Sequence, residues 1–246
     1  PAVTTKKLAW KGVVSELIWF LEGSDDERRL AEIRYDKNRD ELTDIDKYPT
    51  IWTDNADNQG KNLGYENSSL VKKLGPVYGV QWRNWDDKDQ IKELLDSLKN
   101  NPTSRRHILS AWNVAMIDKM ALPPCHLLAQ FYVSSDQSLD CHMYQRSADM
   151  FLGVPFNIAS YSLLMHILGK LLDLTPRYFI HSFGDAHIYL NSVDQVKEQI
   201  KRTPRVLPQL KFPDINNLED LKNLSLDDFV LQGYDPHPAI KAKMAI

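Results

Sequence analysis

A cysteine behind two prolines is the first group in this 246-residue chain that could do chemistry. Cys125 follows Pro123 and Pro124 and precedes the alternating apolar residues 127–133. Because proline fixes φ and has no backbone donor, we expect Cys125 at a stiff loop edge where a strand begins. The thiol could be a nucleophile or a small buried hydrophobe, and most free cysteines are the latter.

Glu16 is a carboxylate inside an apolar helical pattern. It lies beside Leu17 and Ile18 in the run 8–21, and burying it without partners would be costly. The alternative places Glu16 on the polar edge of the helix with Lys11, and periodicity alone favours this second interpretation.

Two adjacent arginines, Arg105 and Arg106, precede a strand-like run at 108–112. Side chains of neighbouring residues in an extended segment point to opposite faces. Both arginines can therefore serve one anion only if the chain bends there. The alternative is a solvated charged turn.

Ile51 and Trp52 are large apolar residues inside a polar segment, residues 25–74. Such a pair usually anchors a loop to a core and less often lines a ligand site. The sequence leaves both interpretations open.

The composition is that of an ordinary folded chain, with 43% hydrophobic and 26% charged residues. We expect one domain over residues 1–246, with a small polar excursion at about 25–74.

The net charge of -3 argues against a general nucleic-acid or membrane-surface binder. Two cysteines cannot form a disulfide framework, no spacing resembles a metal site, and no apolar run could span a bilayer. A cytoplasmic protein without metal is the expectation.

Helical and strand patterns alternate without a regular βαβ rhythm, which predicts an α+β fold. The expected helices are 8–21, 27–35, 50–56, 87–100, 153–173 and 187–202. The expected strands are 108–112, 127–133, 139–146, 177–182 and 229–234. A glycine-rich turn at 75–79 should bring the backbone close to another segment.

Three further blocks, together with the Pro-Pro-Cys-His turn, resemble the thymidylate synthase family, and especially its phage and eukaryotic members. They are Tyr144 to Asp149, Phe151 to Tyr161, and Gly184 to Asn191. The resemblance extends over most of the chain and lacks recognisable motifs only at about 25–49 and 204–228.

The resemblance implies a large mixed, mainly antiparallel, bulged β-sheet covered by helices, with sheets packed back to back in a homodimer. It implies reductive methylation of dUMP to dTMP, with 5,10-methylenetetrahydrofolate supplying carbon and hydride and leaving as dihydrofolate. Cys125 would add to C6 of the pyrimidine, and the guanidinium of Arg146 would favour its thiolate.

Roles follow from the positions that match the family's motifs. The implied catalytic residues are Cys125, Glu16, Tyr78, Arg146, Asn157, His126 and Asp149. The implied dUMP ligands are Arg105, Arg106, Gln145, Arg146, Ser147, Asp149, Asn157, His187 and Tyr189, with Arg105 and Arg106 completing the phosphate site of the other subunit. The implied folate contacts are Lys6, Ile51, Trp52, Leu122, Asp149, Gly153, Phe156, Ala245 and Ile246, where Lys6 meets the glutamate tail and the last two residues close over the site.

Asn157 also implies a pyrimidine preference. An amide offers a donor and an acceptor to O4 and N3 of uracil, whereas cytosine-modifying relatives resemble this pattern with Asp there. The sequence therefore favours dUMP over dCMP.

Two other functions stay open at this point. A folate-dependent deoxyuridylate or deoxycytidylate hydroxymethylase would share the thiolate step, and a catalytically weak nucleotide- or RNA-binding homologue would keep only the arginines.

The sequence also departs from the family pattern. Phe183 and Asn55 replace residues usual in other members. Family members also begin earlier, with an Arg-Thr-Gly-Thr loop that adds an arginine to the phosphate site, so we expect the chain that starts at Pro1 to be a fragment.

Overall fold

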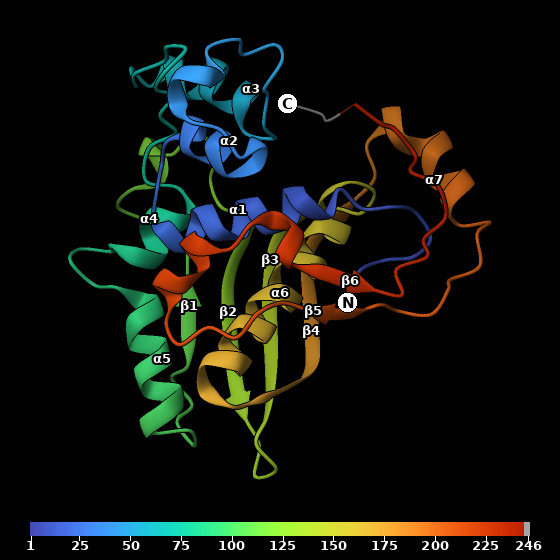
Figure 1. Ribbon diagram of the computed structural model, residues 1–246. Helices are drawn as coiled ribbons and strands as arrows, with labels where there is room; N and C mark the ends of the chain where they lie inside the picture. Colours follow the sequence, from blue (N-terminus) through green and yellow to red (C-terminus); the bar gives the residue numbers. More distant parts are fainter. Residues whose placement is uncertain (244–246) are drawn as a thin grey trace. The chain divides into compact units, whose positions relative to one another are not determined.

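The computed structural model describes residues 1–243 (Figure 1). The contacts divide the chain into two compact units, one of Ser15–Gln130 and one of Pro1–Val14 with the chain from Phe131 onward. Helix α1 (Trp10–Glu22) and strand β2 (His126–Val133) run from one unit into the other. The single domain expected over the whole chain stays a prediction.

The unit 15–130 is mainly helical. Its helices are α2 (Glu27–Tyr35), α3 (Thr53–Asn55), α4 (Tyr78–Arg83) and α5 (Gln90–Asn100), with a π-helical turn at Ala56–Gly60 and 3₁₀ turns at Arg39–Leu42 and Ile117–Lys119. Asp26 caps α2 by accepting a hydrogen bond from the backbone N–H of Arg28, and Asp89 caps α5 in the same way from Lys92. Side-chain caps at both N-termini fix where these helices begin.

The strands of this unit follow from apolar alternation. Strand β1 (Ile108–Ser110) pairs antiparallel with β2, with Leu109 opposite Ala129, and both of these side chains are buried. Helix α5 packs beside β1 and α4. Its buried face consists of Ile91, Leu94 and Leu98, at the helical spacing of three and four residues.

The other unit is built around three strand segments and one long helix. Strand β2 leads through a turn closed by the Ser134 N–H and the Ser138 carbonyl into β3 (Ser138–Asp149). Strand β4 (Thr175–His187) then pairs parallel with β3, and the register shifts between Leu139 and Cys141. The sheet order is β1-β2-β3-β4, so the sheet is mixed and bulged, as expected.

Helix α6 (Gly153–Leu172) connects β3 to β4 and packs against both strands (Figure 1). A parallel pair requires such a crossover. Ala159 on α6 joins Ala2, Leu8 and Val13 in a buried apolar cluster of this unit, against which Phe156 packs. The helix is thus the hydrophobic centre of its unit, as its apolar sequence predicts.

The chain after β4 adds smaller elements. They are α7 (Val193–Gln199), the antiparallel pair β5 (Gln209–Lys211) and β6 (Val230–Gln232), and 3₁₀ turns at Leu190–Ser192, Leu218–Asn223 and Leu226–Asp228.

Most predicted elements are confirmed in place, but several differ in extent or type, including β4, which is longer than the predicted 177–182. The helix expected at 187–202 covers only α7, because His187 still pairs with Asp149 as the last residue of β4. The turn expected at 75–79 leads directly into α4. The helix expected at 50–56 is reduced to α3, with the π-helical turn after it.

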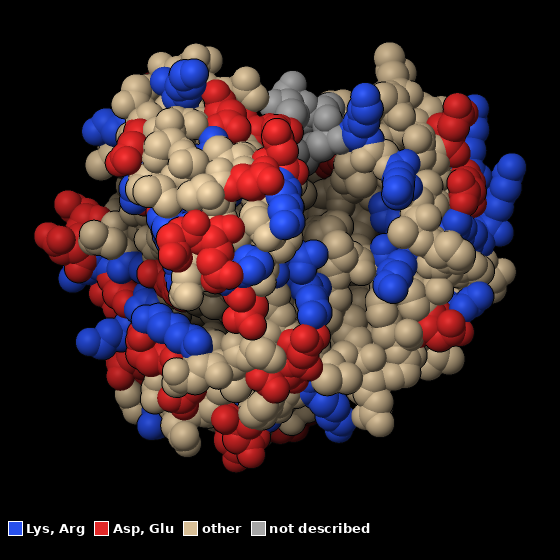
Figure 2. Space-filling view, turned by 45° about the horizontal axis from the view of Figure 1, so that its top comes forward, with Lys and Arg blue, Asp and Glu red and all other residues tan. Residues whose placement is uncertain are grey.

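Acidic and basic side chains are interspersed on the face shown in Figure 2, and neither sign dominates it. This distribution fits a net charge of only -3. Among the described residues, none of the helices has the length and apolar character needed to cross a membrane.

Candidate active site

Cys125 lies at the entry to β2, one residue before the strand begins at His126. Its backbone N–H donates a hydrogen bond to the Tyr78 hydroxyl, over 2.7 Å. The Tyr78 ring stacks on His126, with centroids 4.1 Å apart and planes 17° apart. The predicted position at the start of a strand is confirmed, and the Tyr78 hydroxyl contacts the backbone there in addition to the two prolines.

Tyr78 opens α4, and glycine at the next position lets this helix approach α1. A Cβ on Gly79 would lie 2.8 Å from the Phe20 carbonyl oxygen. The glycine-rich turn therefore does bring two backbones together, as expected. This close approach places the Tyr78 ring 5.1 Å from the Phe20 ring.

Glu16 accepts a hydrogen bond from the Trp52 indole N–H, over 2.7 Å. Burial raises the pKa of Glu16 to about 7, although the indole hydrogen bond acts in the opposite direction. The polar-edge interpretation is wrong, since Lys11 pairs with Asp227 and Glu16 meets a buried tryptophan. A carboxyl group with a pKa near neutrality is suited to proton transfer.

Ile51 and Trp52 have different surroundings. Trp52 is 5% exposed and touches the rings of Trp19, Phe20 and Tyr78, with centroids 5.8, 6.4 and 6.0 Å away. Ile51 is 51% exposed. Trp52 is therefore anchored among aromatic rings, whereas half of the Ile51 side chain is exposed.

The sequence analysis did not identify Trp19 and Phe20 as neighbours of Trp52 and Tyr78. Both follow Glu16 on α1 at the i+3 and i+4 positions, so helical spacing places them on the same face as the carboxylate. That spacing was a usable signal. The hydroxyl contact of Tyr78 had no such signal, because 47 residues separate it from Cys125.

Arg105 and Arg106 are both exposed, and the chain bends at Arg105 before β1 begins. The Ile108 N–H closes a tight turn onto the Arg106 carbonyl, over 2.8 Å. The bend that a shared anion would require is present. Leu122, expected at the folate, lies half-buried three residues before Cys125.

In the other unit, Gln145 links two of the expected residues. Its amide N–H groups donate to the Ser147 carbonyl, over 2.9 Å, and to Asn157 Oδ1, over 3.0 Å. His181 Nε2 lies 2.8 Å from Gln145 Oε1. Because the amide nitrogen faces the Ser147 carbonyl, Oε1 must accept from His181, and Asn157 must turn its oxygen toward Gln145.

His181 is a second residue that sequence reasoning missed. Its Nδ1 is buried and has no hydrogen-bond partner among residues 1–243, and burial lowers the pKa of the imidazole to about 4. The ring is therefore neutral at physiological pH, with its proton on Nε2. Its place on β4 opposite β3 depends on parallel pairing, which the sequence did not reveal.

Asp149, His187 and Tyr189 come together where β3 and β4 end. Asp149 is the register partner of His187, and its carboxylate accepts the N–H groups of Phe151 and Leu152 just before α6. The rings of His187 and Tyr189 are 5.0 Å apart in an edge-to-face contact. The two residues expected at the deoxyribose are thus neighbours.

Arg146 is half-buried on β3, opposite a glycine of β4. A Cβ on Gly184 would lie 2.9 Å from the Arg146 carbonyl oxygen and 2.8 Å from the Tyr144 hydroxyl. Glycine is therefore needed for β4 to approach this part of β3.

Of the remaining expected folate residues, Gly153 and Phe156 lie on the first turn of α6. Lys6 is 4% exposed, donates to the Phe151 carbonyl and lies over the Phe151 ring. Burial lowers the pKa of Lys6 to about 8, while the charge of Asp149 opposes this shift. Ala245 and Ile246 lie outside the described residues.

The two departures from the family pattern are both accommodated. Asn55 is buried and donates to Gln59, and the Phe183 ring lies 4.2 Å from the His181 ring. Within residues 1–243 no group of three or more His, Cys, Asp or Glu side chains is arranged to hold a metal ion.

Comparison with known proteins agrees with this geometry. Residues 1–246 match the model of the family described as Thymidylate synthase. The chain is 54% identical over 247 residues to a probable thymidylate synthase of Escherichia phage T5, covering all of this chain and 85% of that protein. It is 47% identical over 256 residues to the thymidylate synthase of Enterobacteria phage T4, again covering 100% and 85%. The crystal structure of thymidylate synthase from phage T4 superimposes with a TM-score of 0.88 at 46% identity, over 100% of this chain and 85% of that one.

The α+β fold and these matches define an enzyme of the methyltransferase class. The chain belongs to the thymidylate synthase family.

Proposed function

We propose that this enzyme methylates dUMP to dTMP, with 5,10-methylenetetrahydrofolate as cosubstrate, through a covalent bond between Cys125 and C6 of the pyrimidine. The observation that carries the proposal is the mount of Cys125. Its backbone is held by Tyr78 and two prolines at the start of a strand, beside a stacked histidine. A thiol held rigidly can be aligned with one atom of a substrate.

The proposed reaction makes and breaks bonds in a fixed order. The Cys125 sulfur forms a bond to C6, and the displaced electron pair makes C5 nucleophilic as an enolate. C5 then bonds to the methylene carbon of the folate as one of that carbon's two C–N bonds breaks, and loss of the C5 proton breaks the other. Tetrahydrofolate departs and gives a hydride to the methylene, which becomes the methyl group as dihydrofolate forms. The Cys125 sulfur leaves when the C5–C6 double bond returns.

Glu16 supplies the proton relay of the proposal. Its pKa of about 7 lets it exist in both protonation states near neutral pH, and Trp52 fixes one of its oxygens. Tyr78 and His126 form the adjoining polar pair. These three groups would serve proton movement at O4 and C5.

Asn157 reads the pyrimidine edge in this proposal. Gln145 fixes which end of the Asn157 amide is oxygen, because Gln145 itself is oriented by the Ser147 carbonyl. A fixed donor and acceptor match O4 and N3 of uracil. The arrangement supports dUMP as the substrate.

Other expected residues bind the phosphate and the deoxyribose of dUMP. Arg146 and Ser147 bind the phosphate, His187 and Tyr189 bind the deoxyribose hydroxyl, and Arg105 and Arg106 reach the phosphate of the second subunit. Several charged donors are what a phosphate needs.

A homodimer is part of the proposal. Large apolar side chains on β3 and β4 are exposed in the single chain, namely Tyr144, Tyr178, Ile180 and Phe183. A row of such residues on one sheet suits packing against a second copy. The enzyme would act in the cytoplasm, where its two cysteines stay reduced.

The folate lies, in this proposal, against Ile51, Trp52, Leu122, Asp149, Gly153 and Phe156. The exposed side chain of Ile51 supports this assignment. Lys6 can reach the glutamate tail only by leaving the Phe151 carbonyl. Ala245 and Ile246 would close over the bound substrates and exclude water.

Trapping with 5-fluoro-dUMP tests the proposal. Fluorine at C5 cannot leave as a proton does, so the enzyme with methylenetetrahydrofolate should retain a covalent adduct on Cys125, visible by peptide mass spectrometry. The Cys125→Ser variant should still bind dUMP but form no adduct and no product. An adduct on another residue would overturn the assignment.

The mass of the product from dUMP distinguishes the related reaction. A methyl group supports the proposal, and a hydroxymethyl group contradicts it.

A further inference from the structure

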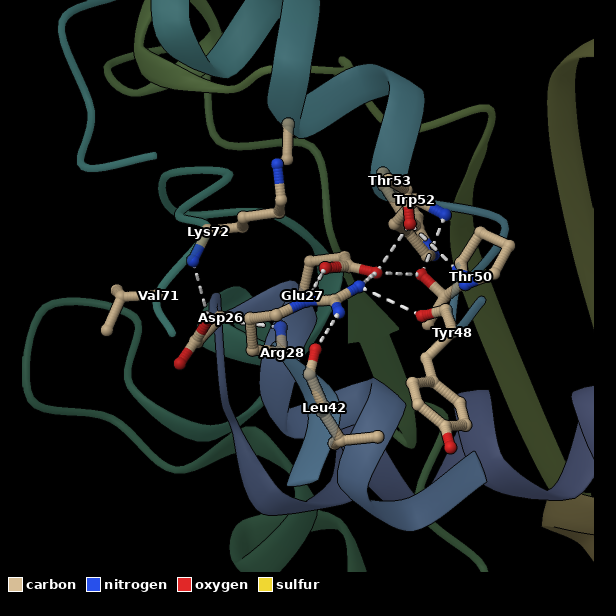
Figure 3. A network of polar contacts seen from close by, with 12 residues as sticks. Asp26, Glu27, Arg28, Leu42, Tyr48, Thr50, Trp52, Thr53, Val71 and Lys72 are labelled. Carbon is tan, nitrogen blue, oxygen red and sulfur yellow. Dashed lines mark hydrogen bonds and ion pairs between the residues drawn. The ribbon is translucent and has the colours of Figure 1, made fainter. Parts of the chain in front are cut away.

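The segment that carries Trp52 is attached to a buried ion pair at the start of α2. Glu27 and Arg28 are both 0% exposed, and two hydrogen bonds of 2.6 and 2.7 Å join their side chains (Figure 3). Neighbours in sequence seldom face each other in this way on a helix. Burying two charges is costly unless their remaining hydrogen bonds are also satisfied.

Those remaining hydrogen bonds all reach the chain that leads to Trp52. Arg28 donates to the carbonyls of Leu42 and Tyr48, over 3.4 and 3.2 Å. Glu27 Oε1 accepts from the hydroxyls of Thr50 and Thr53, over 2.6 and 2.7 Å (Figure 3). The pair therefore contacts this segment at four points between residues 42 and 53.

Each threonine hydroxyl also accepts a backbone N–H of the same turn. Thr50 Oγ1 accepts from the Trp52 N–H, over 3.2 Å, and Thr53 Oγ1 accepts from the Thr50 N–H, over 2.8 Å. One carboxylate oxygen thus determines two hydroxyl directions, and these determine the backbone on both sides of Trp52. Such directional hydrogen bonds specify a conformation in a way that an apolar pair of the same volume would not.

The Trp52 ring links this turn to Glu16 and Tyr78. Its indole N–H donates to Glu16, and its ring lies edge-to-face with the Tyr78 ring, with centroids 6.0 Å apart. Tyr78 in turn accepts the Cys125 N–H. An unbroken series of contacts runs from Glu27 to the proton relay and the nucleophile.

We propose that Glu27 and Arg28 are positioning residues, which hold Trp52, and through it Glu16, in the orientation required for proton transfer. The inference rests on the proposed function of Glu16. Neither Glu27 nor Arg28 touches substrate in this proposal, so they act through the turn at Thr50–Thr53.

The hydroxyl of Thr53 offers the sharpest test, because Thr53→Val removes both hydrogen bonds of that hydroxyl at nearly constant volume and leaves the ion pair intact. We expect kcat for dTMP formation to fall about 10-fold, since small misplacements of a catalytic group are costly. Thr53→Ser, which restores the hydroxyl, should recover most of this loss. If the valine variant does not fold, Thr50→Val and Thr50→Ser serve as the same pair.

A double-mutant cycle separates positioning from general stability. In a Trp52→Phe background the indole N–H is gone, so Thr53→Val should change kcat by less than about 2-fold. An unchanged 10-fold effect in that background overturns the proposal, as does equal activity of the valine and serine variants. Glu27→Gln should lower kcat, whereas Glu32→Gln, on the same helix but directed to Arg29 and Arg39, should not.

Failure of this inference differs from failure of the proposed function. The wild-type enzyme is first trapped with 5-fluoro-dUMP, and absence of its adduct would reject both. A normal wild-type adduct with a fully active Thr53→Val variant rejects the positioning role alone.

Discussion

In the proposed function, the direction of the Asn157 side-chain amide decides which pyrimidine base fits beside it. Its oxygen faces the Gln145 amide nitrogen, which a backbone carbonyl has already oriented. His181 completes the set by donating to the Gln145 oxygen. Two successive hydrogen bonds therefore transmit the fixed polarity of the peptide chain to the residue that we propose reads the pyrimidine, and His181 supports the first of them.

Asn157→Asp should reverse this preference. A carboxylate cannot donate to O4 of uracil but can accept from the amino group of cytosine, so kcat/KM for dUMP should fall by about 100-fold or more relative to that for dCMP. Steady-state kinetics with both nucleotides measures the ratio. An unchanged ratio would remove Asn157 from the pyrimidine edge.

Glu16 should make stability depend on pH. Its pKa of about 7 in the folded protein exceeds the ordinary value of 4.5, so the folded state binds the proton more tightly. The stabilisation is complete below the unfolded pKa and is lost as pH rises through the folded pKa. Relative to Glu16→Gln, the wild type should lose on the order of 1 to 3 kcal/mol of unfolding free energy between pH 5 and 8.

Urea titrations of both proteins across this range give the comparison. Glu22→Gln, on the same helix but paired with Arg29, is the matched control. A pH-independent difference between the wild type and Glu16→Gln would contradict the burial of the Glu16 carboxyl group.

For the individual site residues, the sequence predicted which side chains could act but not which residues they contact. Cys125 was placed correctly because proline geometry is local. Its contact with Tyr78 and the Glu16–Trp52 hydrogen bond join residues 47 and 36 positions apart, and no local rule connects them. Periodicity alone assigned Glu16 to the wrong neighbour.

Among the elements, α4 shows how one glycine sets the distance between two helices. A Cβ on Gly79 would come within 2.8 Å of the Phe20 carbonyl oxygen and 3.0 Å of its Cα. Because these are backbone atoms, α1 or α4 would have to move. The first residue of α4 is Tyr78, so any shift reaches Cys125.

Gly79→Ala should therefore lower both stability and activity. We expect a loss of about 1 to 3 kcal/mol from overpacking, with a fall in kcat from displacement of Tyr78. Gly12→Ala on α1 is the control, because a Cβ there would make only ordinary contacts at 3.9 Å and the change should cost nothing. Thermal unfolding and steady-state turnover of the two variants distinguish the cases.

The helices that the sequence predicted best are those with local signals at their ends. Asp26 caps α2, and α2 occupies the range predicted for it. The strand β4 was underestimated because its last residues are polar and are held by pairing with β3, a contact across an intervening helix. Tertiary pairing also explains why α7 begins six residues later than periodicity indicated.

For the whole molecule, the family resemblance predicted more than periodicity did. The mixed sheet with a bulge was expected from the resemblance, whereas the local pattern indicated only α+β. The hydrogen-bonded network around Glu27 was predicted by neither, because Glu27, Thr50 and Thr53 belong to the polar segment that carries few family motifs.

The homodimer leads to a further prediction, that two copies of the chain share their phosphate sites. Two variants should each be inactive with dUMP when tested alone. Cys125→Ser lacks the nucleophile, and the Arg105→Ala, Arg106→Ala double variant lacks the donated arginines. In a mixed dimer, the Cys125→Ser subunit still offers arginines to the subunit that keeps Cys125.

Mixing the two inactive proteins under conditions that exchange subunits should therefore restore activity. Random pairing makes half of the dimers mixed, each with one complete site, so turnover should reach about a quarter of the wild-type value. Mixing Cys125→Ser with Cys125→Ala restores nothing, because no dimer then holds a thiol. If native mass spectrometry shows mixed dimers and no activity returns, Arg105 and Arg106 serve their own subunit or none, and the shared site is wrong.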